Sequence, residues 1–132
     1  MNRALAVIAN SLAFFLSITL AAFAAQYSPL MAALLALSAL DPLLDVYSYV
    51  TVGKPNGGAV QLLLEGLNIF TAVLLVQLAA LYFSFGYAAL PALMLAYSLL
   101  VITVSVADAK AAVAGGSVEA VETPYLERGG GD

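Results

Sequence analysis

The sequence predicts an all-α integral membrane protein, a four-transmembrane-helix antiparallel bundle with cytoplasmic N- and C-termini. Of its 132 residues, 64% are hydrophobic and 9% are charged, whereas soluble domains are about half apolar and a quarter charged. A helix needs about 20 predominantly apolar residues to cross a hydrocarbon core of about 30 Å. The chain contains four apolar runs of that length, separated by short segments that interrupt helices.

The four spans are expected at about residues 4–25, 30–52, 59–85 and 88–113. Ser28 followed by Pro29 is typical of a helix start, because serine caps a helix and proline fits its first position. The glycines and proline of residues 53–58 predict a turn, and Gly86 predicts a tight hinge. Residues 1–114 are thus expected to form the membrane domain. Residues 115–132, with four acids and five glycines, are predicted to be a flexible acidic cytoplasmic tail.

The basic residues indicate the orientation in the cytoplasmic membrane. With four spans and an inside N-terminus, Arg3, Lys54, Lys110 and Arg128 all fall on the cytoplasmic side, as the positive-inside rule requires. The alternative for the first span is a cleaved signal peptide, because residues 22–24 read Ala-Phe-Ala, a small-residue cleavage pattern. Its apolar run is long for a signal, so we interpret it as a transmembrane helix.

The composition excludes several kinds of chemistry. The chain has no cysteine and no histidine, which excludes disulfides, histidine-ligated haem, Ser-His-Asp catalysis and zinc sites of the usual kind. A net charge of −4 without a basic patch argues against nucleic acid as a partner. Oxygen atoms are therefore the groups left for chemistry within the membrane.

Polar residues follow one face of every predicted span. Residues at steps of three and four lie on the same face of a helix. The stripes consist of Arg3, Asn10 and Ser17; Ser38, Asp41, Asp45 and Ser48; Gln61, Glu65 and Asn68; and Ser98, Ser105 and Asp108. This pattern predicts a bundle with a polar interior.

The depths of these residues predict a site. At a rise of about 1.5 Å per residue, Asp45, Glu65 and Asn10 lie about 9 to 12 Å from the cytoplasmic ends, and Asp41 lies one turn deeper. No lysine or arginine is expected at that level. Buried carboxyl groups without a basic partner are protonated, hold a cation or contact water in a cavity, because a low-dielectric medium disfavours bare charge.

Pro42 adds to this cluster because a proline inside a helix has no amide hydrogen and frees the carbonyl of Ser38. We therefore predict an all-oxygen site for protons or a hard cation such as sodium, calcium or magnesium. Its candidate residues are Asp41, Asp45, Glu65, Asn10, Asn68 and Ser38, with Pro42 as the helix break. No catalytic or cofactor-binding residue is predicted.

Structural alternatives apply to several of these residues. Asp41 and Asp45 are alternatively protonated acids that bond neighbouring helices or meet a base on another subunit. If the second helix ends near Val46, Asp45 lies near the interface, and Tyr47 and Tyr49 form an aromatic belt. The residues expected to serve packing or local pairing are Gln61 and Asn68 as interhelical hydrogen-bond partners, Asp108 with Lys110 as a helix-end pair, and Ser17, Thr71 and Ser105 as small polar packing residues.

Three classes of function fit these observations. The first is a small transporter or channel, expected to be a homo-oligomer, in which the carboxyl groups bind a proton or hard cation. The second is an accessory or assembly subunit of a larger membrane complex, for example a respiratory one. The third is a lipid-modifying enzyme, which fits least because only Lys54 and Arg3 could bind a phosphate group. The bilayer is the partner common to all three.

Overall fold

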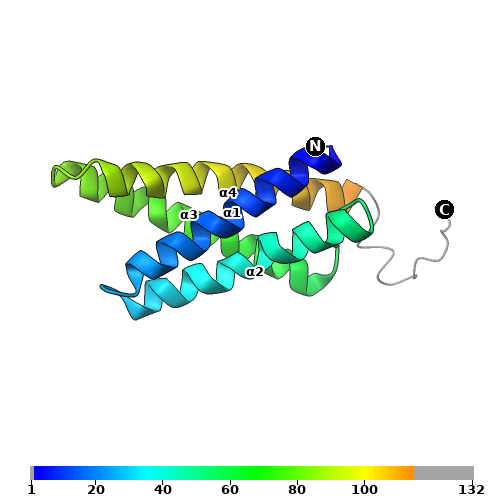
Figure 1. The fold of residues 1–132 in the computed structure, drawn as a ribbon, viewed down its shortest axis with the longest axis horizontal. Coiled ribbons are helices and arrows are strands. Elements are labelled where there is room, and N and C mark those ends of the chain that lie inside the picture. Colours follow the sequence, from blue (N-terminus) through cyan, green and yellow to red (C-terminus); the bar gives the residue numbers. More distant parts are fainter. Residues whose placement is uncertain (1, 115–132) are drawn as a thin grey trace.

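The computed structural model describes residues 2–114, which form four antiparallel α-helices joined by short loops (Figure 1). The helices are α1 (Arg3–Ala24), α2 (Pro29–Thr51), α3 (Ala59–Ser84) and α4 (Ala89–Ala114). Each is long and apolar enough to cross a membrane, so the chain is a multi-pass membrane protein. The predicted acidic tail at residues 115–132 lies outside the described residues.

Polar caps fix where the first two helices begin. The Asn2 side chain accepts a hydrogen bond from the Leu5 amide at 2.8 Å, and the Ser28 hydroxyl oxygen accepts one from the Met31 amide at 3.2 Å. Pro29 then occupies the first turn of α2, where a missing amide hydrogen costs nothing. These bonds satisfy amides that have no partner inside the helix.

Two glycines end helices α2 and α3. Gly53 and Gly86 have φ angles of +88° and +94°, in the left-handed region that favours glycine. The Gly53 amide donates to the carbonyls of Ser48 and Tyr49 at 3.2 and 3.1 Å, and the Tyr87 amide donates to the Tyr82 carbonyl at 3.1 Å. Both turns therefore satisfy the last carbonyls of a helix and reverse the chain.

The bundle consists of two hairpins. Helix α1 packs closely along α2 and α3 along α4, while the α2–α3 and α1–α4 contacts between the hairpins are less extensive. The start of α1, the end of α4 and the loop of residues 52–58 lie together (Figure 1). We call this the basic end, because it holds Arg3, Lys54 and Lys110; the opposite end, with the loops 25–28 and 85–88, is the uncharged end.

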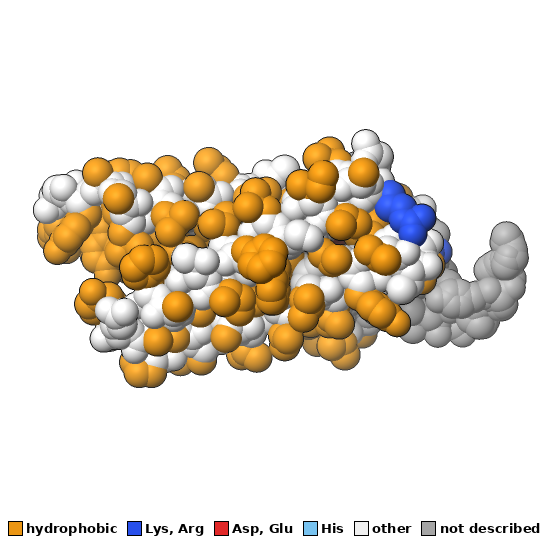
Figure 2. All heavy atoms as spheres, in the orientation of Figure 1, with side chains coloured by type: hydrophobic (Ala, Val, Ile, Leu, Met, Phe, Trp, Pro, Cys, Tyr) orange, Lys and Arg blue, Asp and Glu red, His pale blue; other side chains and the backbone are white. Residues whose placement is uncertain are grey.

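The outer surface is apolar and much of the interior is polar. Figure 2 shows hydrophobic side chains over the length of the bundle, with basic side chains at one end. Exposed leucines, isoleucines, valines and phenylalanines occur on all four helices, as a lipid-facing surface requires. All the acids of the predicted stripes are buried. The other buried stripe residues are Asn10, Ser17, Ser38, Gln61, Asn68, Ser98 and Ser105. The bundle interior is thus where the polar stripes meet.

The first span is part of this bundle. Ala13, Ser17 and Leu20 of α1 are buried, and Ala13 and Leu20 belong to the apolar core shared with the other helices. Arg3 at its start donates a hydrogen bond to the Val50 carbonyl in the last turn of α2. A cation is favourable there because helix carbonyls carry partial negative charge at the C-terminus.

Candidate functional site

Three carboxyl groups lie together inside the basic half of the bundle. Asp41 and Asp45 project from successive turns of α2, and Glu65 faces them from α3. These three residues form what we call the carboxyl triad: one oxygen from each lies within 4.8 Å of the others. Their exposed fractions are 1%, 0% and 3%, respectively. The predicted convergence of α2 and α3 acids is therefore present in the structure.

Two amide side chains of α3 hold the triad in place. Gln61 Nε2 donates to Asp41 Oδ1 at 2.6 Å and to Asp45 Oδ1 at 3.1 Å. Asn68 Nδ2 donates to Asp41 Oδ2 at 2.8 Å. Gln61 and Asn68 lie one turn on either side of Glu65, so both are interhelical hydrogen-bond partners, as predicted. Both oxygens of Asp41 consequently accept bonds from fixed donors.

Three oxygens of the site keep free acceptor capacity. Within residues 2–114, Asp45 Oδ2, Glu65 Oε1 and Asn68 Oδ1 are buried and have no hydrogen-bond partner. Buried polar atoms in native structures nearly always have partners, since leaving one unpaired costs about 1 to 3 kcal/mol. Each of these oxygens can therefore still accept a hydrogen bond or coordinate a cation.

The charge of the triad limits how many of its carboxyl groups are ionised. Two unit charges 4.8 Å apart repel by about 3.5 kcal/mol at an effective dielectric constant of about 20. Three such pairs sum to about 10 kcal/mol, which is comparable to the stability of a whole domain. The basic residues Arg3, Lys54 and Lys110 are all exposed at the basic end. The three carboxyl groups therefore cannot all be ionised unless a cation is bound beside them; without a cation, at least one of them carries a proton.

Asp108 of α4 is a fourth buried acid, and its predicted role as a helix-end partner of Lys110 is wrong. Asp108 Oδ1 accepts a hydrogen bond from the Tyr49 hydroxyl at 2.6 Å, and Oδ2 accepts one from Asn10 Nδ2 at 3.1 Å. Asp108 lies beside Asp45. Asn10, predicted as part of the carboxylate site, thus contacts Asp108 from α1 and completes a four-helix polar layer.

The alternative position of Asp45 near the interface is also wrong. Helix α2 continues to Thr51, six residues past Asp45. Tyr47 is 68% exposed whereas Tyr49 is 4% exposed, so only Tyr47 faces the surroundings of the bundle. Tyr49 points inward because it lies four residues after Asp45, on the polar stripe. The aromatic belt, which is the alternative for a helix that ends near Val46, is therefore wrong for Tyr49.

Ser38 and Pro42 lie at the inner boundary of the site. The Ser38 hydroxyl donates to Thr71 Oγ1 at 3.0 Å, and Thr71 donates to the Leu67 carbonyl at 2.9 Å. Ser38 therefore links α2 to α3 one turn beyond Asp41, toward the uncharged end. Pro42 is buried inside α2 between the two aspartates, where its ring replaces the amide that would otherwise bond the Ser38 carbonyl.

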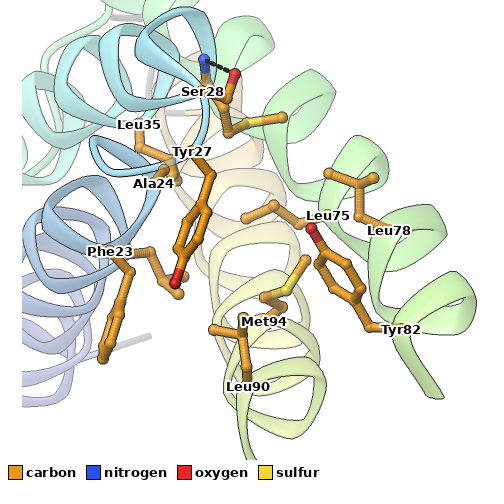
Figure 3. Close-up of a pocket in the computed structure, with 12 residues that line it drawn as sticks. Phe23, Ala24, Tyr27, Ser28, Leu35, Leu75, Leu78, Tyr82, Leu90 and Met94 are labelled. Atoms are coloured by element: carbon orange, nitrogen blue, oxygen red, sulfur yellow. Dashed lines mark hydrogen bonds between the residues drawn. The ribbon is translucent and has the colours of Figure 1, made fainter. Parts of the chain in front are cut away.

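The uncharged end contains a cavity that sequence analysis did not anticipate. It has a volume of about 350 Å³ and lies between the tips of the two hairpins. Figure 3 shows Tyr27 and Phe23 of the first hairpin opposite Tyr82 and Leu90 of the second. Apolar side chains form most of its wall. The two hairpins therefore pack less closely here than around the carboxyl triad.

No protein-family profile, no curated protein and no solved structure matches this chain. The function is therefore inferred from the geometry of its own site.

Proposed function

We propose that this protein is a small membrane transporter or channel whose carboxyl triad binds protons or a hard cation. The observation that carries the proposal is the cluster of three acids within 4.8 Å, buried between α2 and α3 with unpaired oxygens on Asp45, Glu65 and Asn68. Ionisable residues inside a membrane are costly to bury and typically mark ion or proton pathways.

Proton binding is supported by the division of hydrogen bonds within the triad. Gln61 and Asn68 together provide donors to both oxygens of Asp41. Asp45 and Glu65 each retain an oxygen without a donor. Carboxyl groups at this separation share protons and titrate as a coupled group. Asp45 and Glu65 are thus the pair that takes up and releases the proton, and Asp41 is held as their acceptor.

Cation binding is supported by the composition of the same site. Sodium, calcium and magnesium prefer carboxylate and carbonyl oxygens, and the Asn68 amide oxygen faces no donor. Two oxygens bound to one calcium ion at about 2.3 to 2.6 Å lie at most about 4.6 to 5.2 Å apart, and the three triad oxygens fall within 4.8 Å of one another. A proton and a cation would then compete for one site.

The orientation and assembly belong to the same proposal. The exposed basic residues Arg3, Lys54 and Lys110 gather at one end of the bundle, which the positive-inside rule places in the cytoplasm. The carboxyl triad then lies in the cytoplasmic half of the membrane. We propose that the working unit is a homo-oligomer.

The first test is ligand-dependent stabilisation of the full-length protein in detergent. Thermal unfolding would be followed by circular dichroism at several pH values, with sodium, calcium or magnesium added in turn. A ligand that binds only the folded state raises the unfolding temperature. The wild type should be stabilised, whereas Asp45→Asn and Glu65→Gln, which keep the side-chain shape but remove a charge, should lose this response.

Ser48→Ala is the matched control, because Ser48 lies on the same stripe of α2 but donates its hydroxyl to the Lys54 carbonyl. It should respond to ligand as the wild type does. Wild-type responses in both triad variants would exclude the proposed site. A response to pH alone identifies the proton as the ligand, and a response to one metal at constant pH identifies the cation.

A further inference from the structure

A layer of hydroxyl groups lies directly beyond the carboxyl triad, toward the uncharged end. Each helix contributes one residue to it, and all four are buried: Ser17, Ser38, Thr71 and Tyr97. We call these residues the hydroxyl layer. Ser38 bonds Thr71 at 3.0 Å, and Tyr97 lies beside both Ser17 and Ser38. Asp41 is one turn from Ser38 on α2, and Asn68 is one turn from Thr71 on α3.

Two members of the hydroxyl layer have unused hydrogen-bonding capacity. The Tyr97 hydroxyl and Ser17 Oγ are buried without a hydrogen-bond partner among the described residues. Each hydroxyl can donate one hydrogen bond and accept two, and keeping it unpaired inside a membrane protein is costly. The hydroxyl layer is thus a polar layer deep in the bundle with unused donors and acceptors.

An apolar ring separates the hydroxyl layer from the cavity. It consists of Leu20, Leu35, Leu75 and Met94, one from each helix, all buried and all lining the cavity. Each lies three or four residues from a member of the hydroxyl layer, which is one helical turn toward the uncharged end. Leu35, Leu75 and Met94 are seen from the cavity side in Figure 3. The order along the bundle is therefore carboxyl triad, hydroxyl layer, apolar ring and cavity.

We propose that the hydroxyl layer conducts protons between the carboxyl triad and the cavity, and that the apolar ring is the gate of this path. The inference rests on the proposed function and identifies the proton as the ion that moves. Each hydroxyl accepts a proton on its oxygen and releases its own O–H proton to the next acceptor, so it returns to the neutral state. A metal cation would instead need about six oxygen ligands at every step, which single hydroxyls in a packed core do not provide.

The apolar ring provides a reason why this path is closed in the structure described here. Leu20, Leu35 and Leu75 offer no donor or acceptor, so protons do not cross them unless water enters or the hairpins separate. The cavity lies immediately outside the ring, between hairpin tips that pack loosely. Small movements of one hairpin against the other would therefore join the hydroxyl layer to the cavity.

The test uses the full-length protein in liposomes that contain a pH-sensitive dye, with a potassium gradient and valinomycin to drive protons. Met94→Ala removes part of the ring and should raise the proton flux several-fold over the wild type. Met31→Ala is the matched control, because Met31 lines the same cavity but is only partly buried and lies outside the ring. It should leave the flux unchanged.

The role of the hydroxyl layer is tested in the Met94→Ala background. Adding Tyr97→Phe removes only the hydroxyl oxygen and should return the flux to the wild-type level. Tyr82→Phe, at a partly buried cavity-lining tyrosine, should leave the raised flux in place. Circular dichroism of each variant checks that the helical fold is retained.

The outcomes separate this inference from the proposed function. If Tyr97→Phe leaves the raised flux intact, or if Met94→Ala and Met31→Ala conduct equally, the path is overturned while ligand-dependent stabilisation through the triad still stands. If Glu65→Gln in the Met94→Ala background conducts as before, protons bypass the triad and the path is again overturned. If the wild-type protein itself shows no ligand-dependent stabilisation, the proposed function is overturned.

Discussion

At the scale of single residues, the two kinds of buried acid differ in how their oxygens are satisfied. Asp108 accepts bonds from Tyr49 and Asn10 through both oxygens, so both of its oxygens have partners. Asp45 and Glu65 each keep an oxygen without a partner among the described residues. The polar layer therefore combines one acid whose oxygens are both paired with two acids that each keep an unpaired oxygen.

The bond between Tyr49 and Asp108 leads to a stability prediction. Tyr49→Phe removes a buried donor at 2.6 Å from Asp108 Oδ1 and should lower the free energy of unfolding by about 1 to 3 kcal/mol, because a buried acceptor then loses its donor. Tyr47→Phe, on the exposed face of the same helix, should change it by less than about 0.5 kcal/mol. Unfolding in mixed micelles with increasing dodecyl sulfate measures both. Equal effects would contradict the inward role of Tyr49.

Local spacing predicted part of this residue-level arrangement. Asp41 and Asp45 are four residues apart on α2, and Glu65 lies on the neighbouring antiparallel helix α3. Their convergence therefore follows from helix geometry. Asp108 has partners 98 and 59 residues away in the chain. The stripe of Ser98, Ser105 and Asp108 predicted an inward face, but the neighbouring Lys110 suggested a local pair. The actual partners of Asp108, which are Asn10 and Tyr49, follow only from the packing of the helices.

At the scale of helices, the sequence specified the boundaries well because the capping residues act locally. Ser28, Pro29, Gly53 and Gly86 occupy the ends expected for them, and every observed helix begins and ends within one residue of its predicted span. The packing of the two hairpins was not predictable in the same way. Apolar residues occur on all sides of each span, so hydrophobic periodicity does not specify the looser tips or the cavity between them.

Two glycines should respond oppositely to the same substitution. Gly66 lies inside α3 on an exposed face, and a Cβ there would meet nothing within 4 Å. Gly66→Ala should therefore raise the free energy of unfolding by about 0.5 to 1 kcal/mol, because glycine is a poor helix residue. Gly86→Ala also meets open space but has a φ of +94°.

For Gly86→Ala we expect a loss of about 1 to 2 kcal/mol, since alanine is strained in the left-handed region. The same micelle unfolding experiment compares both variants. Changes of the same sign would show that the turn at Gly86 adopts another conformation or that α3 does not tolerate a methyl group at position 66.

At the scale of the whole molecule, the lipid-facing surface has one feature that supports self-association. Gln77 is exposed on α3, seven residues before the helix ends at Ser84. An amide facing hydrocarbon leaves its donor and acceptor unpaired, and glutamine bonds between transmembrane helices are worth about 0.6 to 2 kcal/mol. A second copy of the chain could provide the partner for this amide.

The prediction is that Gln77→Leu shifts the particle toward smaller assemblies. Size would be measured by light scattering after extraction from the native membrane in mild detergent. Gln26→Leu, in the exposed loop at the uncharged end, is the control and should leave the size unchanged. Stoichiometric amounts of other membrane chains in the wild-type particle would contradict the homo-oligomer and favour the accessory-subunit interpretation.

If the carboxyl triad takes up a charge from the basic end, as proposed, its off-centre position makes that binding depend on the membrane voltage. Asp45 and Glu65 lie six residues from the ends of α2 and α3, or about 9 Å of helix, which is about a quarter of the membrane thickness. A charge that reaches them from the basic end crosses that share of the electric field, worth about 0.6 kcal/mol per 100 mV. The binding constant of the triad for that charge would therefore change about threefold per 100 mV, without any movement of the helices.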